Sequence, residues 1–62
     1  MLVTHTHTSK DKVTGEARTK TVEMRAERLS LPDDFVPTGE GEWIKATETR
    51  LSIHKHIVTV TH

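Results

Sequence analysis

The final 20 residues limit the fold more than any other part of the chain. From Trp43 to His62 there is no glycine, proline, asparagine or aspartate, the residues that usually mark turns. As one extended strand, at about 3.3 Å per residue, this run would span roughly 66 Å. A compact chain of this length has a radius of gyration of only about 10–11 Å. We therefore expect the run to bend at bulges into a small barrel, to split into shorter strands, or to extend into a partner molecule.

The first residues also predict a strand. Residues 2–8 read L-V-T-H-T-H-T, and threonine and valine favour extended backbone because their branched side chains restrict χ1. Alternation places Val3, His5 and His7 on one face and threonines on the other. Residues 9–15, S-K-D-K-V-T-G, are polar and end in glycine, which indicates a hairpin loop.

Residues 17–31 fit a strand better than a helix. The apolar residues at the centre of this segment recur with a period of two, which is typical of a strand. A helix would place Glu23 and Glu27 one turn apart, where their charges repel. The apolar positions change face toward the end of the segment, so we expect a β-bulge near residues 27–29.

Residues 32–42 predict a loop. Their sequence, P-D-D-F-V-P-T-G-E-G-E, contains two prolines and two glycines, and Pro32 ends the preceding strand. Phe35 and Val36 are the large apolar residues of this segment. We expect them to anchor the loop onto the sheet.

The composition favours a small all-β domain that is completed by association. Only 32% of the residues are hydrophobic, and Phe35 and Trp43 are the only aromatic ones. A core of this kind contributes only about 3–5 kcal/mol. The chain has no cysteine, so no disulfide or thiolate metal site stabilises it. We expect one domain, residues 1–62, with a small antiparallel sheet or barrel completed by oligomerisation. Its three long, bulged strands would cover residues 2–8, 17–31 and 43–62.

The charge balance gives no general attraction to nucleic acid or to an anionic membrane. Nine basic and nine acidic residues cancel at neutral pH. Residues 29–42 carry only acidic charge between two mildly basic segments, which suits self-association. No apolar run approaches the roughly 18 residues of a membrane span, and no apolar signal region opens the chain. We expect no membrane segment and a cytoplasmic location by default; a virion protein or a fragment of a larger chain would look the same.

Two H-x-H motifs, at residues 5–7 and 54–56, are the strongest chemical signal. In a strand, residues i and i+2 project from the same face, so both imidazoles of a motif can converge on zinc or iron. If the first and last strands are neighbours, four imidazoles meet. One motif per chain around a three-fold axis resembles the iron-binding tips of phage tail spikes and fibres, a likeness that covers three residues. The other interpretations are a solvated face and a pH-responsive interface. The candidate ligands are His5, His7, His54 and His56.

No enzyme is predicted. Serine, histidine and acidic residues occur in no spacing typical of a catalytic triad, and residues 39–41 lack the lysine and helix of a phosphate-binding loop. A chain this short rarely encloses the pocket that an active site needs.

The favoured function is a non-enzymatic module that binds a second copy of itself. We expect Trp43 to be mostly buried, in the core or at an interface. The predicted interface residues are Trp43, Phe35, Ile57, Val58 and Val60. One alternative is the histidine metal-binding module described above. The other is a β-ribbon that binds nucleic acid, although Glu23 and Glu27 would oppose phosphate. The basic residues of that ribbon are Arg18, Lys20, Arg25 and Arg28.

Overall fold

The computed structural model describes all 62 residues and contains five β-strands in a single sheet. The predicted all-β class is confirmed. None of the chain forms a helix long and apolar enough to cross a membrane. The strands are β1 (Leu2–Asp11), β2 (Ala17–Arg25), β3 (Val36–Gly39), β4 (Glu42–Glu48) and β5 (Ser52–Thr61).

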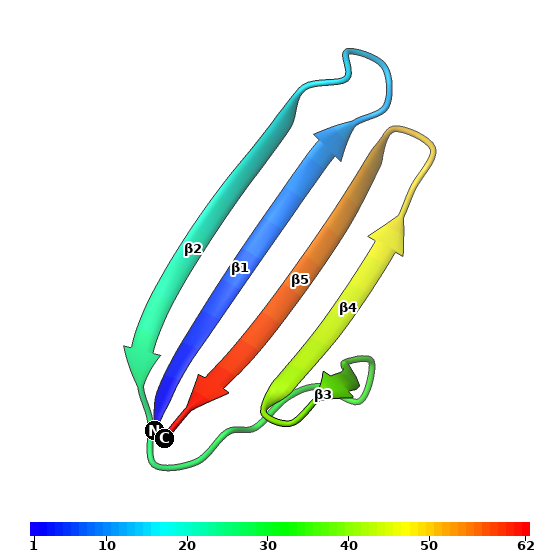
Figure 1. The fold of residues 1–62 in the computed structure, drawn as a ribbon. Helices are drawn as coiled ribbons and strands as arrows, with labels where there is room; N and C mark the ends of the chain where they lie inside the picture. Colours follow the sequence, from blue (N-terminus) through cyan, green and yellow to red (C-terminus); the bar gives the residue numbers. More distant parts are fainter.

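The sheet has the order β2-β1-β5-β4-β3, and every neighbouring pair is antiparallel. The first and last strands of the chain are therefore neighbours at its centre, and both termini lie at the same end (Figure 1). Because β2 and β3 lie at opposite edges, residues 26–35 have to cross from one edge to the other.

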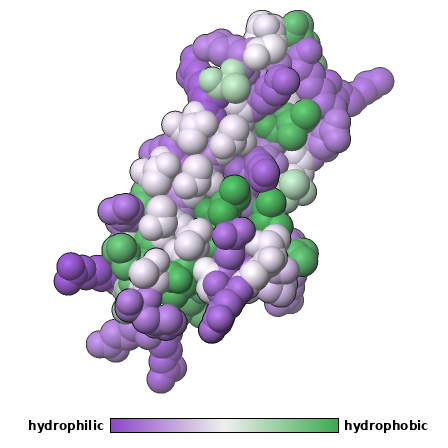
Figure 2. Space-filling view, in the orientation of Figure 1, coloured by the Kyte–Doolittle hydropathy of each residue, from purple (hydrophilic) through white to green (hydrophobic).

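The alternation along the strands gives the sheet two different faces. The first, which we call the histidine face, carries Val3, His5 and His7 of β1 beside His54, His56 and Val58 of β5. The second, which we call the threonine face, is the one in view in Figure 2, where near-neutral residues form a pale band. Threonine hydroxyls meet there across β1 and β2, at 3.4 Å between Thr6 and Thr21 and 3.5 Å between Thr8 and Thr19. The threonine face comprises Thr4, Thr6, Thr8, Thr19, Thr21 and Thr59, with Ile44 and Ile57.

The long C-terminal run splits into two strands, so the sheet has five strands rather than three. The turn lies at residues 49–51, where the Thr49 N–H donates to the Ser52 carbonyl at 2.8 Å. The Ser52 N–H in turn donates to the Thr49 hydroxyl at 3.1 Å. Hydroxyl side chains thus stabilise this turn without glycine or proline.

The predicted strand at 17–31 is correct only as far as Arg25, and the expected bulge near 27–29 is absent. Ala26 makes the last pair with β1, where its N–H donates to the Met1 carbonyl at 3.1 Å. After Ala26 the chain leaves the sheet and crosses the histidine face. Leu29 and Leu31 do not continue the alternation of β2, because they lie outside the sheet and pack onto the histidine face.

β1 is longer than predicted, because it continues to Asp11 instead of ending at residue 8. The Asp11 carboxylate accepts hydrogen bonds from the N–H groups of Val13 at 2.8 Å and Thr14 at 3.2 Å. Gly15, with a φ of 76°, then closes the turn in a left-handed conformation that suits glycine. Only residues 12–16 form the loop.

The sheet has almost no interior. Val3 and Val58, 5% and 3% exposed, are its only buried residues. The accessible surface is 4994 Å², whereas a compact protein of this mass exposes about 4,000 Å². The radius of gyration is 12.9 Å, and the extents are 40 × 20 × 16 Å. A single chain therefore leaves most of both faces in contact with water.

Candidate functional site: the histidine cluster and its adjoining cavity

The two H-x-H motifs come together on the histidine face. β1 projects His5 and His7, and β5 projects His54 and His56, because residues i and i+2 of a strand share a face. The register places His7 directly opposite His56. The condition for four imidazoles to meet, that the first and last strands be neighbours, is therefore satisfied. We call these four residues the histidine cluster.

The imidazoles of the cluster contact one another in two pairs. His5 Nε2 lies 3.0 Å from His56 Nδ1, and His7 Nε2 lies 3.2 Å from His54 Nδ1. Each distance fits a hydrogen bond in which one ring nitrogen donates and the other accepts. The rings of His7 and His56 also stack, with centroids 4.2 Å apart. At the far end, the Ser52 hydroxyl lies 3.0 Å from His54 Nε2.

The surroundings of His56 favour its neutral form. Partial burial lowers the pKa of His56 below its usual value, and the nearby charges of His7, His5, Lys45 and His54 lower it further. Protonation of His56 is therefore disfavoured both by burial and by the positive charge of its neighbours.

The geometry of the cluster limits how it can hold a metal ion. Nowhere in the chain are three or more histidine, aspartate or glutamate side chains arranged around a common metal position. The cluster presents two separate pairs of ring nitrogens, one from His5 and His56 and one from His7 and His54. A metal held here would need further ligands from solvent or from another molecule.

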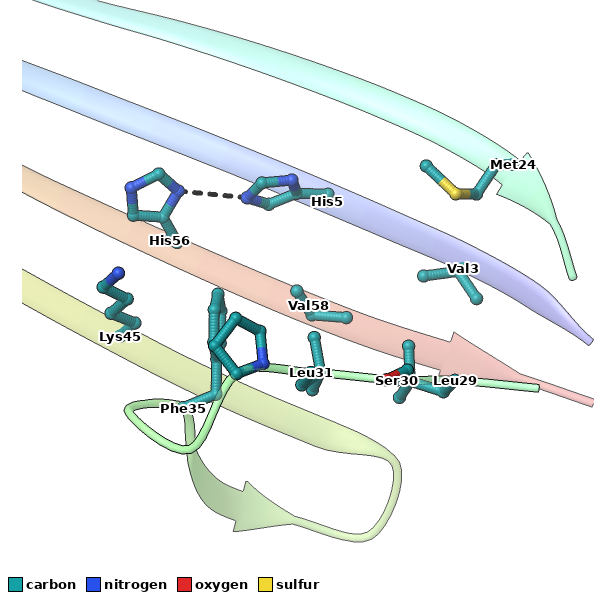
Figure 3. Close-up of a pocket in the computed structure, with 11 residues that line it drawn as sticks. Val3, His5, Met24, Leu29, Ser30, Leu31, Phe35, Lys45, His56 and Val58 are labelled. Atoms are coloured by element: carbon teal, nitrogen blue, oxygen red, sulfur yellow. Dashed lines mark hydrogen bonds between the residues drawn. The ribbon is translucent and has the colours of Figure 1, made fainter.

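A cavity of about 400 Å³ adjoins the cluster, between the histidine face and residues 29–35 (Figure 3). Its apolar walls come from Val3, Met24 and Val58 on the strands and from Leu29, Leu31 and Phe35 on the crossing segment. His5, His56 and Lys45 lie at its other end. The apolar segment thus roofs the sheet without filling the space beneath it.

Phe35 anchors the crossing segment, as predicted. Its ring meets His56 edge-on, with centroids 6.4 Å apart. Lys45 Nζ lies 5.8 Å from the centre of the same ring and 2.6 Å from the Asp34 carboxylate. Val36, the second predicted anchor, instead begins β3 and stays 58% exposed.

The predicted interface residues do not form one surface. Val58 is buried within the chain, and Phe35 packs on His56. Trp43 is partly buried, opposite Val58 of β5 and Pro37 of β3. Val60 lies on the histidine face, whereas Ile57 lies on the threonine face.

The predicted nucleic-acid residues are dispersed. Arg18 and Lys20 lie on one face of β2, Arg25 lies on the other, and Arg28 lies beyond the strand. Their arrangement does not give one continuous basic surface.

Lys45 and Met24 were not singled out as site residues from the sequence. Each belongs to a strand separated from the histidines in sequence, and only the register brings it to the cavity. Met24 shares its face of β2 with Val22, which is a weak sequence signal for it. β4 carries apolar residues on both faces, so the sequence pattern does not distinguish Lys45.

No family model, no curated protein and no solved structure matches this chain.

Proposed function

We propose that this protein is a non-enzymatic module that associates with a second copy of itself by pairing β2 strands edge to edge. The observation that carries the proposal is the unpaired outer edge of β2. All nine of its residues are exposed, and no other strand lies beside that edge. Long open edges of this kind are templates for pairing with another chain.

The hydrogen bonds between β1 and β2 identify the groups that point outward. Met1 and Ala26 bond each other twice, through the Ala26 N–H and through the N-terminal ammonium. Bonded and non-bonded pairs alternate along an antiparallel ladder, so the even-numbered residues of β2 bond to β1. The outward N–H and C=O groups belong to Ala17, Thr19, Thr21, Glu23 and Arg25.

The opposite edge of the sheet is poorly suited to pairing. β3 has only four residues, its register shifts between Pro37 and Gly39, and proline has no N–H to donate. Short strands, bulges and proline are the usual features of an edge that avoids association. β2 is therefore the one long edge open to a partner.

A two-fold axis through Thr21 pairs all nine residues of β2 with a second copy. Thr21 then faces the partner's Thr21, and Thr19 faces the partner's Glu23. The remaining opposed pairs are Lys20 with the partner's Val22, Arg18 with the partner's Met24, and Ala17 with the partner's Arg25. No two residues of like charge face each other in this register, so charge repulsion does not oppose the pairing. The ladder would join two five-stranded sheets into one of ten strands.

The thin interior supports association. With two buried residues, a single chain has little apolar burial to offset the entropy of ordering its backbone. Extending the sheet adds hydrogen bonds and side-chain contacts that the isolated chain lacks.

The test is the solution mass of the wild type and of charge variants across a dilution series. The wild type should show twice 7.0 kDa. Thr19→Glu should weaken association about tenfold, because it places glutamate opposite the partner's Glu23 at two symmetric positions. Thr19→Glu combined with Glu23→Lys should restore it, because the opposed pair becomes attractive. A monomeric wild type contradicts self-association, and a dimer indifferent to both changes contradicts this surface.

A second candidate function is binding of a transition metal by the histidine cluster. The paired nitrogens, 3.0 and 3.2 Å apart, are near the separation of about 3.3 Å that two zinc ligands adopt at 2.0–2.1 Å from the ion. Zinc should raise the melting temperature of the wild type, and EDTA should reverse the rise. Replacing one histidine of each pair, in His7→Gln/His56→Gln, should abolish it, while His62→Gln, an exposed histidine outside the cluster, should not. A melting temperature unmoved by zinc contradicts this candidate.

A further inference from the structure

We propose that the cavity between the histidine face and residues 29–35 binds a small amphipathic acid, an apolar chain that carries one carboxylate. The ligand's chain would lie between Met24, Leu29 and Leu31, and its carboxylate would meet His5, His56 and Lys45. This proposal is independent of self-association, because it uses a face of the sheet and not its edge.

The size and the lining of the cavity fit an apolar chain. Its volume of about 400 Å³ falls within the range of about 300–1,000 Å³ that small-molecule sites occupy. Seven of the side chains around it are apolar or proline, and they come from both the sheet and the segment above it. Met24 remains 50% exposed at the mouth of the cavity. A bound apolar chain would remove this surface from water.

The charge of the lining selects a carboxylate over a cation. No acidic side chain lines the cavity, whereas Lys45 and two histidines meet at one end. The Asp34 carboxylate accepts one hydrogen bond from Lys45 Nζ, and an ammonium has three N–H donors. Lys45 therefore keeps donors for a second carboxylate. A cationic head group would meet Lys45 without any compensating acid in the lining.

The polar groups lie together at one end of the cavity, which gives the ligand a direction. Val3 and Val58, both buried, form part of the apolar floor. His5 lies two residues after Val3 on β1, and His56 lies two residues before Val58 on the antiparallel β5. The apolar chain of the ligand would lie against the valines, and its carboxylate would lie against the histidines. A neutral apolar molecule would fill the walls and leave the charged end without a partner.

The experiment compares by calorimetry three probes that share a ten-carbon alkyl chain, each below the concentration at which it forms micelles or a separate phase. Decanoate should bind at least about tenfold more tightly than decanol, because a hydrogen bond to a charged group contributes more than a neutral one. Decyltrimethylammonium should not bind. Lys45→Met should remove the preference for decanoate over decanol. Equal binding of all three probes, or no binding of decanoate, overturns the proposal.

A matched pair of variants locates the site. Met24 and Val22 lie on the same face of β2 and are 50% and 40% exposed, but only Met24 lines the cavity. Met24→Glu should weaken decanoate binding about tenfold through like charge, and Val22→Glu should change it little. Equal losses in the two variants place binding elsewhere and overturn the proposal.

Discussion

His7 and His56 lie directly opposite each other on the two central strands, with ring planes 3° from parallel and centroids 4.2 Å apart. His7 bonds through its backbone to Lys20 of β2, so toward β5 it occupies a non-hydrogen-bonded position. Side chains at such positions are the closest across an antiparallel ladder. The register of β1 and β5 therefore creates the stacked pair around which the histidine cluster forms.

Acid should destabilise the fold. The pKa of His56 is lowered by burial and by its neighbours, so the folded state binds fewer protons than the unfolded chain. Stability should therefore fall as the pH drops below the unfolded-state value of about 6.5, and level off below the folded-state value. The melting temperature at pH 5.5 should be lower than at pH 7.5. His7→Gln should reduce this difference, whereas His62→Gln should preserve it; an unchanged wild-type melting temperature would contradict the interpretation.

Gly41→Ala should destabilise the protein by about 1–3 kcal/mol. Gly41 has a φ of 72°, and an added Cβ would lie 2.9 Å from the Val60 carbonyl oxygen. Gly41 also accepts a hydrogen bond from the Val60 N–H at 2.7 Å. Gly39→Ala is the control, because nothing lies within 4 Å of an added Cβ there. Chemical denaturation compares the two variants, and equal losses would contradict the assignment of strain to Gly41.

Phe35→Ala should cost about 1–3 kcal/mol, less than for a fully buried phenylalanine, because Phe35 is only half-buried. The loss should free residues 29–35 from the histidine face, which increased proteolysis within this segment would detect. Val36→Ala is the control, since Val36 is 58% exposed. A Phe35→Ala variant as stable and as resistant as the control would show that Phe35 does not anchor the segment.

Trp43 should report no change when the protein associates. It lies on β4, separated from β2 by β5 and β1, and is half-buried against its own chain. Its emission maximum should therefore be intermediate between buried and water-exposed, and constant across dilution. A shift to shorter wavelength at high concentration would place Trp43 at the interface, as predicted from the sequence.

The sequence was sufficient to predict the strands that are defined by alternation. Threonine, valine and histidine alternate along β1, so the side on which His5 and His7 lie follows from period two. Phe35 was predicted to anchor a loop because it is a large apolar residue within a segment rich in proline, glycine and acidic residues. In each case the relevant information is local to a few residues.

The sequence was insufficient where tertiary contacts decide the structure. The turn at residues 49–51 depends on hydrogen bonds of Thr49 and Ser52 and lacks the usual turn residues. The cavity depends on a register that places Lys45 opposite His56. Such pairings join residues far apart in the chain, and they cannot be predicted from the alternation of residues within one strand.

Hydrogen exchange along β2, measured amide by amide at high and low protein concentration, tests edge-to-edge association most directly. The inward amides of Lys20 and Val22 should be protected at both concentrations, because they bond to β1. The outward amides of Thr19, Thr21 and Glu23 should be protected only at high concentration, where a partner strand covers them. Rapid exchange of these three amides in a sample that light scattering shows to be dimeric would contradict the account.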